Sequence, residues 1–88
     1  MDGREAMRVI ASGLHSKFRK ETKERRALTY CAPFFDKEAN VWTLELKKKG
    51  SKDTAQLRLE HELNDSAFET MVRLVNNYLT EDYEQRRN

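Results

Sequence analysis

The stretch Val41-Trp42-Thr43-Leu44-Glu45-Leu46-Lys47 decides the fold that this sequence predicts. Its largest apolar side chains, Trp42, Leu44 and Leu46, fall at every second position. The polar residues Thr43 and Glu45 lie between them. A period of two is that of a β-strand with one buried and one solvated face. We therefore expect a strand over residues 41–47 in a sheet that is covered on one side only.

The flanking segments extend this strand into a three-stranded antiparallel meander. Residues 28–32 alternate in the same way, and Pro33 either ends this segment or confines it to an edge strand. Residues 36–40 have the composition of a turn. Residues 49–53 contain Gly50 and predict a hairpin connection, after which Leu57 and Leu59 alternate with polar residues in a third strand.

Apolar residues at helical spacing predict a helix on each side of the sheet sequence. The first is expected over about residues 3–22, with Asp2 as its cap and with Gly13 either weakening the helix or allowing a close contact. The second starts with Asn64 or Ser66 as its cap and runs to about residue 80. Its apolar stripe consists of Phe68, Met71, Val72, Val75, Tyr78 and Leu79.

The predicted fold class is α+β, a two-layer α-β-β-β-α arrangement with both helices on one face of the meander. The expected covered face carries Leu28, Tyr30, Trp42, Leu44, Leu46, Leu57 and Leu59. The expected open face carries Thr29, Cys31, Val41, Thr43, Glu45, Lys47, Gln56, Arg58 and Glu60.

The composition fits one small domain over residues 1–88, with a core over about 3–80 and a polar tail over 81–88. The chain is 38% hydrophobic and 36% charged, and its 17 basic and 15 acidic residues leave a net charge of +2. This near-neutral total conceals an uneven distribution. Residues 1–30 hold eight bases and four acids, whereas residues 61–88 hold three bases and six acids.

No motif in the sequence predicts catalysis, a metal site or a cofactor. His15, His61 and Cys31 lack the spacing of zinc ligands, and the three glycines form no phosphate-binding loop. We therefore expect a non-enzymatic protein with no small-molecule substrate. The lone cysteine, the absence of a signal-peptide pattern and the absence of a long apolar run predict a cytoplasmic or nuclear protein that is neither secreted nor inserted in a membrane.

Two clusters of basic residues are the strongest candidates for function. Lysine and arginine side chains can neutralise nucleic-acid phosphates, although lysines at strand ends also serve solubility. One cluster lies in the second hairpin and the other at the exit of the first helix. The candidate nucleic-acid-binding residues are Lys47, Lys48, Lys49, Lys52, Arg19, Lys20, Lys23, Arg25 and Arg26.

The aromatic pair after Pro33 is a second candidate site. Phe34 and Phe35 are adjacent, so an extended backbone cannot turn both rings into the core. One ring is then either tucked under the turn or available to a partner. With Thr43 and Arg58 of the predicted open face, Phe34 and Phe35 form a candidate partner-binding set.

The predicted element order resembles that of the double-stranded-RNA-binding domain and of the small Alu-domain proteins of the signal recognition particle. This resemblance in topology implies RNA binding. In the first of these families the second helix opens with a lysine-rich motif that contacts phosphates. The corresponding positions here are Asn64-Asp65-Ser66-Ala67-Phe68-Glu69.

Two functions therefore stay open at the level of sequence. The first is a small binding module that contacts RNA or DNA phosphates through the basic clusters. The second is a protein-interaction module, acting as a regulator, an inhibitor or a homodimer, that uses the open sheet face or an edge strand.

Overall fold

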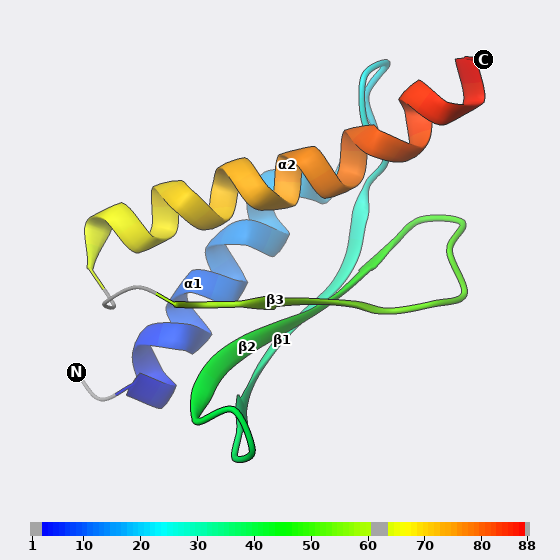
Figure 1. Cartoon of the computed structure of the whole chain (residues 1–88). Helices are drawn as coiled ribbons and strands as arrows, with labels where there is room; N and C mark the ends of the chain where they lie inside the picture. Colours follow the sequence, from blue (N-terminus) through cyan, green and yellow to red (C-terminus); the bar gives the residue numbers. More distant parts are fainter. Residues whose placement is uncertain (1–2, 61–63, 88) are drawn as a thin grey trace.

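The computed structural model describes residues 3–60 and 64–87 of the chain. The elements follow in the order α1 (Gly3–Phe18), β1 (Leu28–Asp36), β2 (Val41–Lys48), β3 (Ala55–Arg58) and α2 (Asp65–Arg87). The three strands form one antiparallel sheet in the order β1-β2-β3 (Figure 1). The predicted α+β fold with the order α-β-β-β-α is therefore confirmed.

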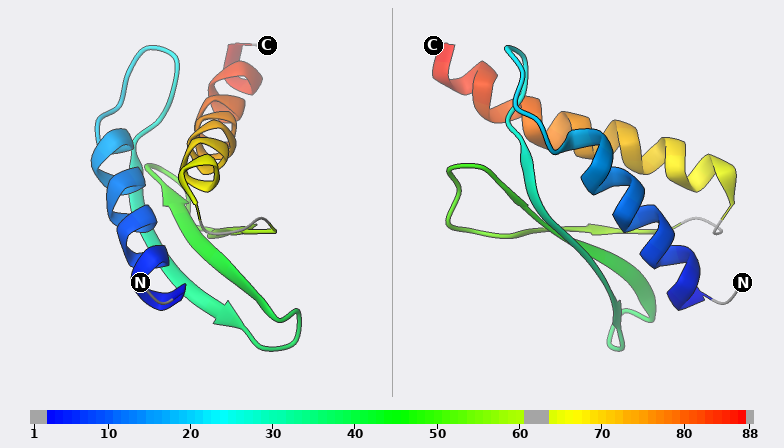
Figure 2. Two further views of the ribbon diagram at one scale, coloured as in Figure 1. Left: turned by 90° about the vertical axis from the view of Figure 1, so that its left-hand side faces the viewer. Right: turned by 180° about the vertical axis from the view of Figure 1, so that it is seen from behind.

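Both helices pack on the face of the sheet that carries Leu44 and Leu46. At one end of β2 the indole of Trp42 lies against Gly3 of α1, and at the other end Lys48 lies over the ring of Tyr78 in α2. Trp42, Leu44, Leu46 and Lys48 point to the same face because side chains alternate along a strand. The helices cross each other over this face, as Figures 1 and 2 show.

A single hydrophobic core joins the two helices to the sheet. In α1 the apolar residues at helical spacing are buried; they are Met7, Ile10, Ala11, Leu14 and Phe18. From the strands and the end of the meander come Leu28, Leu44, Leu46 and Leu59, and from α2 come Ala67, Met71, Val75 and Leu79. The predicted stripe of α2 is confirmed, with Phe68, Val72 and Tyr78 partly buried at its margin.

The predicted face of β1 is wrong from Tyr30 onward, because the register shifts between Leu28 and Tyr30. Leu28 is buried as expected, but Tyr30 is 44% exposed on the open face. Cys31 pairs with Leu46 and packs against the core instead of facing solvent. An extra residue in one strand reverses the face of every residue after it, and such a bulge leaves no trace in the alternation of the sequence.

Thr43 also departs from its predicted exposure, since only 1% of it is accessible. It does lie on the open face, between Phe34 of β1 and Arg58 of β3. The Arg58 guanidinium reaches across β2 to the Asp36 carboxylate at 3.9 Å. These longer side chains surround the short threonine and shield it from solvent.

The turn between β1 and β2 forms as predicted. Asp36 Oδ1 accepts hydrogen bonds from the backbone amides of Glu38 and Ala39, at 3.0 and 3.2 Å. Asn40 closes the turn with a φ of 56°, a conformation that asparagine adopts more readily than most residues. Pro33 lies inside β1, on an edge of the sheet, which is one of the two positions the sequence predicted.

The helix ends were predicted less well than the helices. α1 ends at Phe18 instead of residue 22, and α2 continues to Arg87 instead of ending near residue 80, so the expected tail is helical up to that residue. Asn64 is the cap of α2, since its Oδ1 accepts a hydrogen bond from the Ala67 amide at 3.1 Å, and the alternative cap Ser66 lies inside the helix. The predicted cap Asp2 and the residue His61 lie outside the described residues.

Candidate nucleic-acid interface

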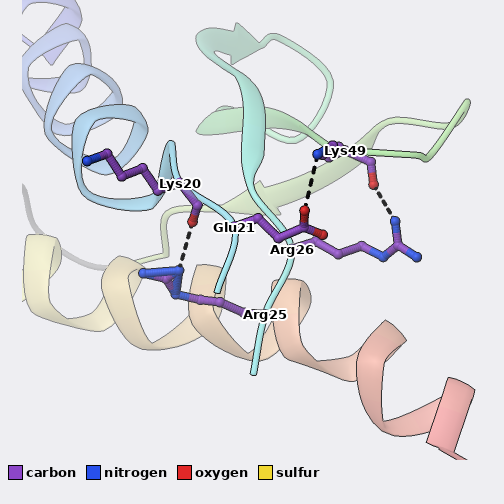
Figure 3. Close-up of polar contacts among 5 residues, drawn as sticks. All are labelled: Lys20, Glu21, Arg25, Arg26 and Lys49. Carbon is purple, nitrogen blue, oxygen red and sulfur yellow. Dashed lines mark hydrogen bonds and ion pairs between the residues drawn. The ribbon is translucent and has the colours of Figure 1, made fainter. Parts of the chain in front are cut away.

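The two predicted basic clusters meet at one end of the molecule. The first lies in the loop of residues 19–27 that leaves α1, and the second in the end of β2 and the loop that follows it. The Lys49 amide donates to the Ala27 carbonyl at 2.9 Å, and the Lys49 ammonium lies 3.1 Å from Oε2 of Glu21 (Figure 3). Residues separated by more than twenty positions thus form one surface, which we call the basic end. Its predicted members are Arg19, Lys20, Lys23, Arg25, Arg26, Lys47, Lys48, Lys49 and Lys52.

Arg26 joins three parts of the chain beneath this surface. Its backbone amide donates to the Leu79 carbonyl of α2 at 3.3 Å, and its Nη1 donates to the Lys49 carbonyl at 2.8 Å. Gly50 makes the second contact possible, because a Cβ at that position would lie 2.5 Å from the same nitrogen. Gly50 also has a φ of +85°, which glycine adopts without strain.

The burial of Arg26 corrects its predicted role. Only 5% of Arg26 is accessible, so its guanidinium, which bonds to the hairpin, is not available to a phosphate. The sequence offered no sign of this, since arginine is among the residues least often buried. The contact of Lys49 with Glu21 was equally hidden, because the two residues are 28 positions apart.

Two further basic residues are held against aromatic rings. The Arg25 guanidinium lies over Phe18, 5.0 Å from the ring centroid, and its Nη1 donates to the Lys20 carbonyl at 3.2 Å. The Lys48 ammonium lies 4.5 Å from the centroid of Tyr78 and donates to its carbonyl at 3.4 Å. Such cation–π contacts stabilise the folded chain by about 0.5–1 kcal/mol at accessible sites. Arg25 and Lys48 therefore help to fix the shape of the basic end.

The remaining five basic side chains are accessible and are not engaged in contacts of this kind. Arg19, Lys20, Lys23 and Lys52 are exposed, and Lys47 is partly exposed on the open face of the sheet. None of their charged groups forms a hydrogen bond or ion pair with another described residue. Three acidic residues, Glu21, Glu24 and Asp53, are also exposed in the same loops and reduce the local positive charge.

The loop of residues 19–27 has a defined shape at its outer end. Thr22 Oγ1 accepts hydrogen bonds from the amides of Glu24 and Arg25, at 3.3 and 3.2 Å, and the Thr22 amide donates to the Arg25 carbonyl at 3.0 Å. This turn presents Lys23 at its tip. The accessible charges are thus carried on a folded loop and a hairpin that are tied to each other.

The candidate partner-binding residues do not form one exposed set. Phe34 lies on the open face beside Thr43 and Arg58, whereas Phe35 is on the helix side, where it meets Trp42 edge to face with centroids 5.4 Å apart. Phe35 is 42% exposed and Phe34 is partly buried. Thr43 is too deeply buried to contact a partner.

The cysteine Cys31 lies partly buried in β1. Burial raises the pKa of the Cys31 thiol from 9.0 to about 11, which disfavours the thiolate needed for nucleophilic attack. Among residues 3–60 and 64–87, His, Cys, Asp and Glu side chains form no group of three that could hold a metal ion. No helix in that part of the chain is long and apolar enough to cross a membrane.

Comparison of the chain with protein families, with curated proteins and with solved structures gave no significant match.

Proposed function

We propose that the protein binds nucleic acid through the phosphates, with Arg19, Lys20, Lys23, Lys47 and Lys52 of the basic end as the contacting residues. The observation that carries the proposal is the meeting of the two clusters, through the contacts of Lys49 with Ala27 and Glu21. A duplex carries one negative charge per roughly 1.7 Å of its axis, so several cations must lie on one surface to contact neighbouring phosphates at the same time. Each cluster alone would provide too few cations for this.

The contacts inside the basic end support this assignment. Arg25 and Arg26 donate to backbone carbonyls of the two loops, Lys48 donates to a carbonyl of α2, and Lys49 pairs with Glu21, so the five accessible side chains project from a surface that is already ordered. A preformed surface loses less conformational entropy on binding than two flexible loops do. Arginine and lysine contacts to phosphate supply affinity and position without reading sequence, so the expected ligand is a backbone and not a particular base sequence.

The test is the salt dependence of binding to a fluorescein-labelled duplex DNA, measured by anisotropy. Five phosphate contacts predict that log affinity falls with log salt at a slope of about −4.5. The double variant Lys23→Glu/Lys52→Glu takes one accessible residue from each cluster and should reduce the steepness of that slope by about 2. Both positions lie outside the contacts that hold the basic end together, so the variant should keep its fold by circular dichroism.

Arg73→Glu is the matched control, since Arg73 is exposed in the middle of α2 and lies outside the basic end. It reverses one charge without removing a proposed contact, and its slope should equal that of the wild type. The proposal is wrong if duplex DNA, duplex RNA and single strands all fail to bind at low salt. A loss of affinity with Arg73→Glu as large as that of the double variant would also contradict it.

A further inference from the structure

A cavity of about 570 Å³ opens at the other end of β1, between the first turns of α1 and the end of the strand. In both views of Figure 2 the turn between β1 and β2 lies at the opposite end of the molecule from the loop of residues 19–27. The cavity is therefore separate from the basic end. Its lining residues are Arg4, Arg8, Pro33, Phe34, Phe35, Lys37 and Trp42.

Three cations surround this cavity. Arg4 and Arg8 are four residues apart in α1 and thus lie one above the other on the same side of the helix. Lys37 comes from the turn between β1 and β2, on the opposite wall. All three are exposed, and among the described residues that line the cavity none is acidic. An anion, such as a phosphate, is the ligand that this charge attracts.

The cavity also offers a flat aromatic surface. Phe35 is held edge to face by Trp42, with an interplanar angle of 67°, and 42% of it remains accessible. Trp42 is fixed in turn by α1, because a Cβ at Gly3 would come within 2.7 Å of its Nε1. Gly3 therefore allows the helix to approach the indole. An exposed phenyl ring held in this way can stack against a planar group.

We propose that this cavity binds a nucleotide, with its base stacked on Phe35 and its phosphate held by Arg4, Arg8 and Lys37. An inorganic anion would leave the ring unused, and an uncharged planar molecule would leave three cations unused. Stacking of a base on an aromatic side chain stabilises binding by about 1–3 kcal/mol, and arginine is suited to bind phosphate through two hydrogen bonds. The volume lies within the roughly 300–1,000 Å³ of small-molecule sites.

The same chemistry is present in a free nucleotide and in the 5′-phosphorylated end of a single strand. The experiment must therefore separate these two sources. It must also be independent of the basic end, so it is carried out in the Lys23→Glu/Lys52→Glu background. A failure of the proposed phosphate-backbone binding then leaves the result for the cavity unaffected.

Trp42 is the only tryptophan of the chain and lines the cavity, so its fluorescence reports occupancy directly. The probes are adenosine 5′-monophosphate, adenosine, inorganic phosphate, and one short oligonucleotide with either a 5′-phosphate or a 5′-hydroxyl. We expect adenosine 5′-monophosphate to change the Trp42 fluorescence in a saturable way. The affinity for adenosine and for inorganic phosphate should be at least about tenfold weaker. A 5′-phosphorylated oligonucleotide that binds more tightly than the free nucleotide identifies the strand end as the source; equal or weaker binding identifies the free nucleotide.

Arg8→Glu tests the site because it reverses an exposed charge that the core does not use, and it should weaken nucleotide binding at least about tenfold. Arg73→Glu is the matched control, since Arg73 is exposed in α2 and lies outside both the cavity and the basic end, and it should leave nucleotide affinity unchanged. Phe35→Ala should weaken the binding of adenosine 5′-monophosphate but not that of inorganic phosphate. The proposal fails if adenosine binds as well as its monophosphate, if neither the nucleotide nor the phosphorylated strand gives a saturable change, or if Arg73→Glu weakens nucleotide binding as much as Arg8→Glu.

Discussion

Gly13 is a residue whose type is explained by a packing contact with another helix. Glycine inside a helix costs about 1 kcal/mol relative to alanine, and the sequence alone leaves its purpose open. In the structure a Cβ on Gly13 would lie 2.9 Å from Cε2 of Phe68, so the glycine lets α1 and α2 approach closely. The close contact, one of the two readings of the sequence, is thereby confirmed.

Gly13→Ala should therefore fail to stabilise the protein, although alanine is the better helix former. Crowding against Phe68 is expected to offset the gain in helix propensity and to lower the free energy of unfolding by up to about 2 kcal/mol. Urea denaturation followed by circular dichroism measures the difference. Ser16→Ala, at an exposed position of the same helix, is the control and should raise stability by a few tenths of a kcal/mol. Equal stabilisation by the two variants would show that the contact is unimportant.

At the scale of elements, the existence of both helices and all three strands could be predicted from the sequence, because each has a regular apolar period. The face of β1 could not, since a bulge between Leu28 and Tyr30 shifts the register without changing the period on either side. The cavity could not be predicted from the sequence for the same reason. Phe35 lines the same cavity as Arg4 and Arg8 only because of that shifted register, and neither arginine stood out in the sequence.

The start of α2 offers a test at this scale. Asn64→Ala removes the side chain that accepts the Ala67 amide and should lower the free energy of unfolding by about 1 kcal/mol, measured by urea denaturation. Ser66→Ala changes the other residue that could have capped the helix and should have a smaller effect, because Ser66 is already helical and exposed. If Ser66→Ala is the more harmful of the two, the assignment of the cap is wrong.

For the whole molecule, the first and last thirds of the chain, which carry opposite net charge in the sequence, are joined by a backbone hydrogen bond. The basic loop of residues 19–27 packs against the second half of α2 through the bond from the Arg26 amide to the Leu79 carbonyl (Figure 1). The acidic last third of the chain thus lies beside the basic first third. Charge counted along the chain predicted an imbalance, but its arrangement in space depends on contacts between residues more than fifty positions apart.

Arg26→Met tests how far the basic end depends on its buried guanidinium. Methionine retains much of the side-chain bulk but cannot donate to the Lys49 carbonyl, so the free energy of unfolding should fall by roughly 2–3 kcal/mol in urea denaturation. Lys23→Met removes the same charge from an exposed position of the same loop and should change stability by no more than about 0.5 kcal/mol. Similar values for the two variants would mean that Arg26 serves only as a surface charge.

The position of Arg26 also bears on the order in which the chain can assemble during its synthesis. Arg26 leaves the ribosome before two of its partners, Lys49 and Leu79, and Leu79 is made long after Lys49. Until α2 has been made, the Arg26 amide lacks its acceptor, the Leu79 carbonyl, and the core residues of the sheet are in contact with α1 alone. The nascent chain therefore cannot complete this fold before α2 is made, and α2 closes the loop that follows α1.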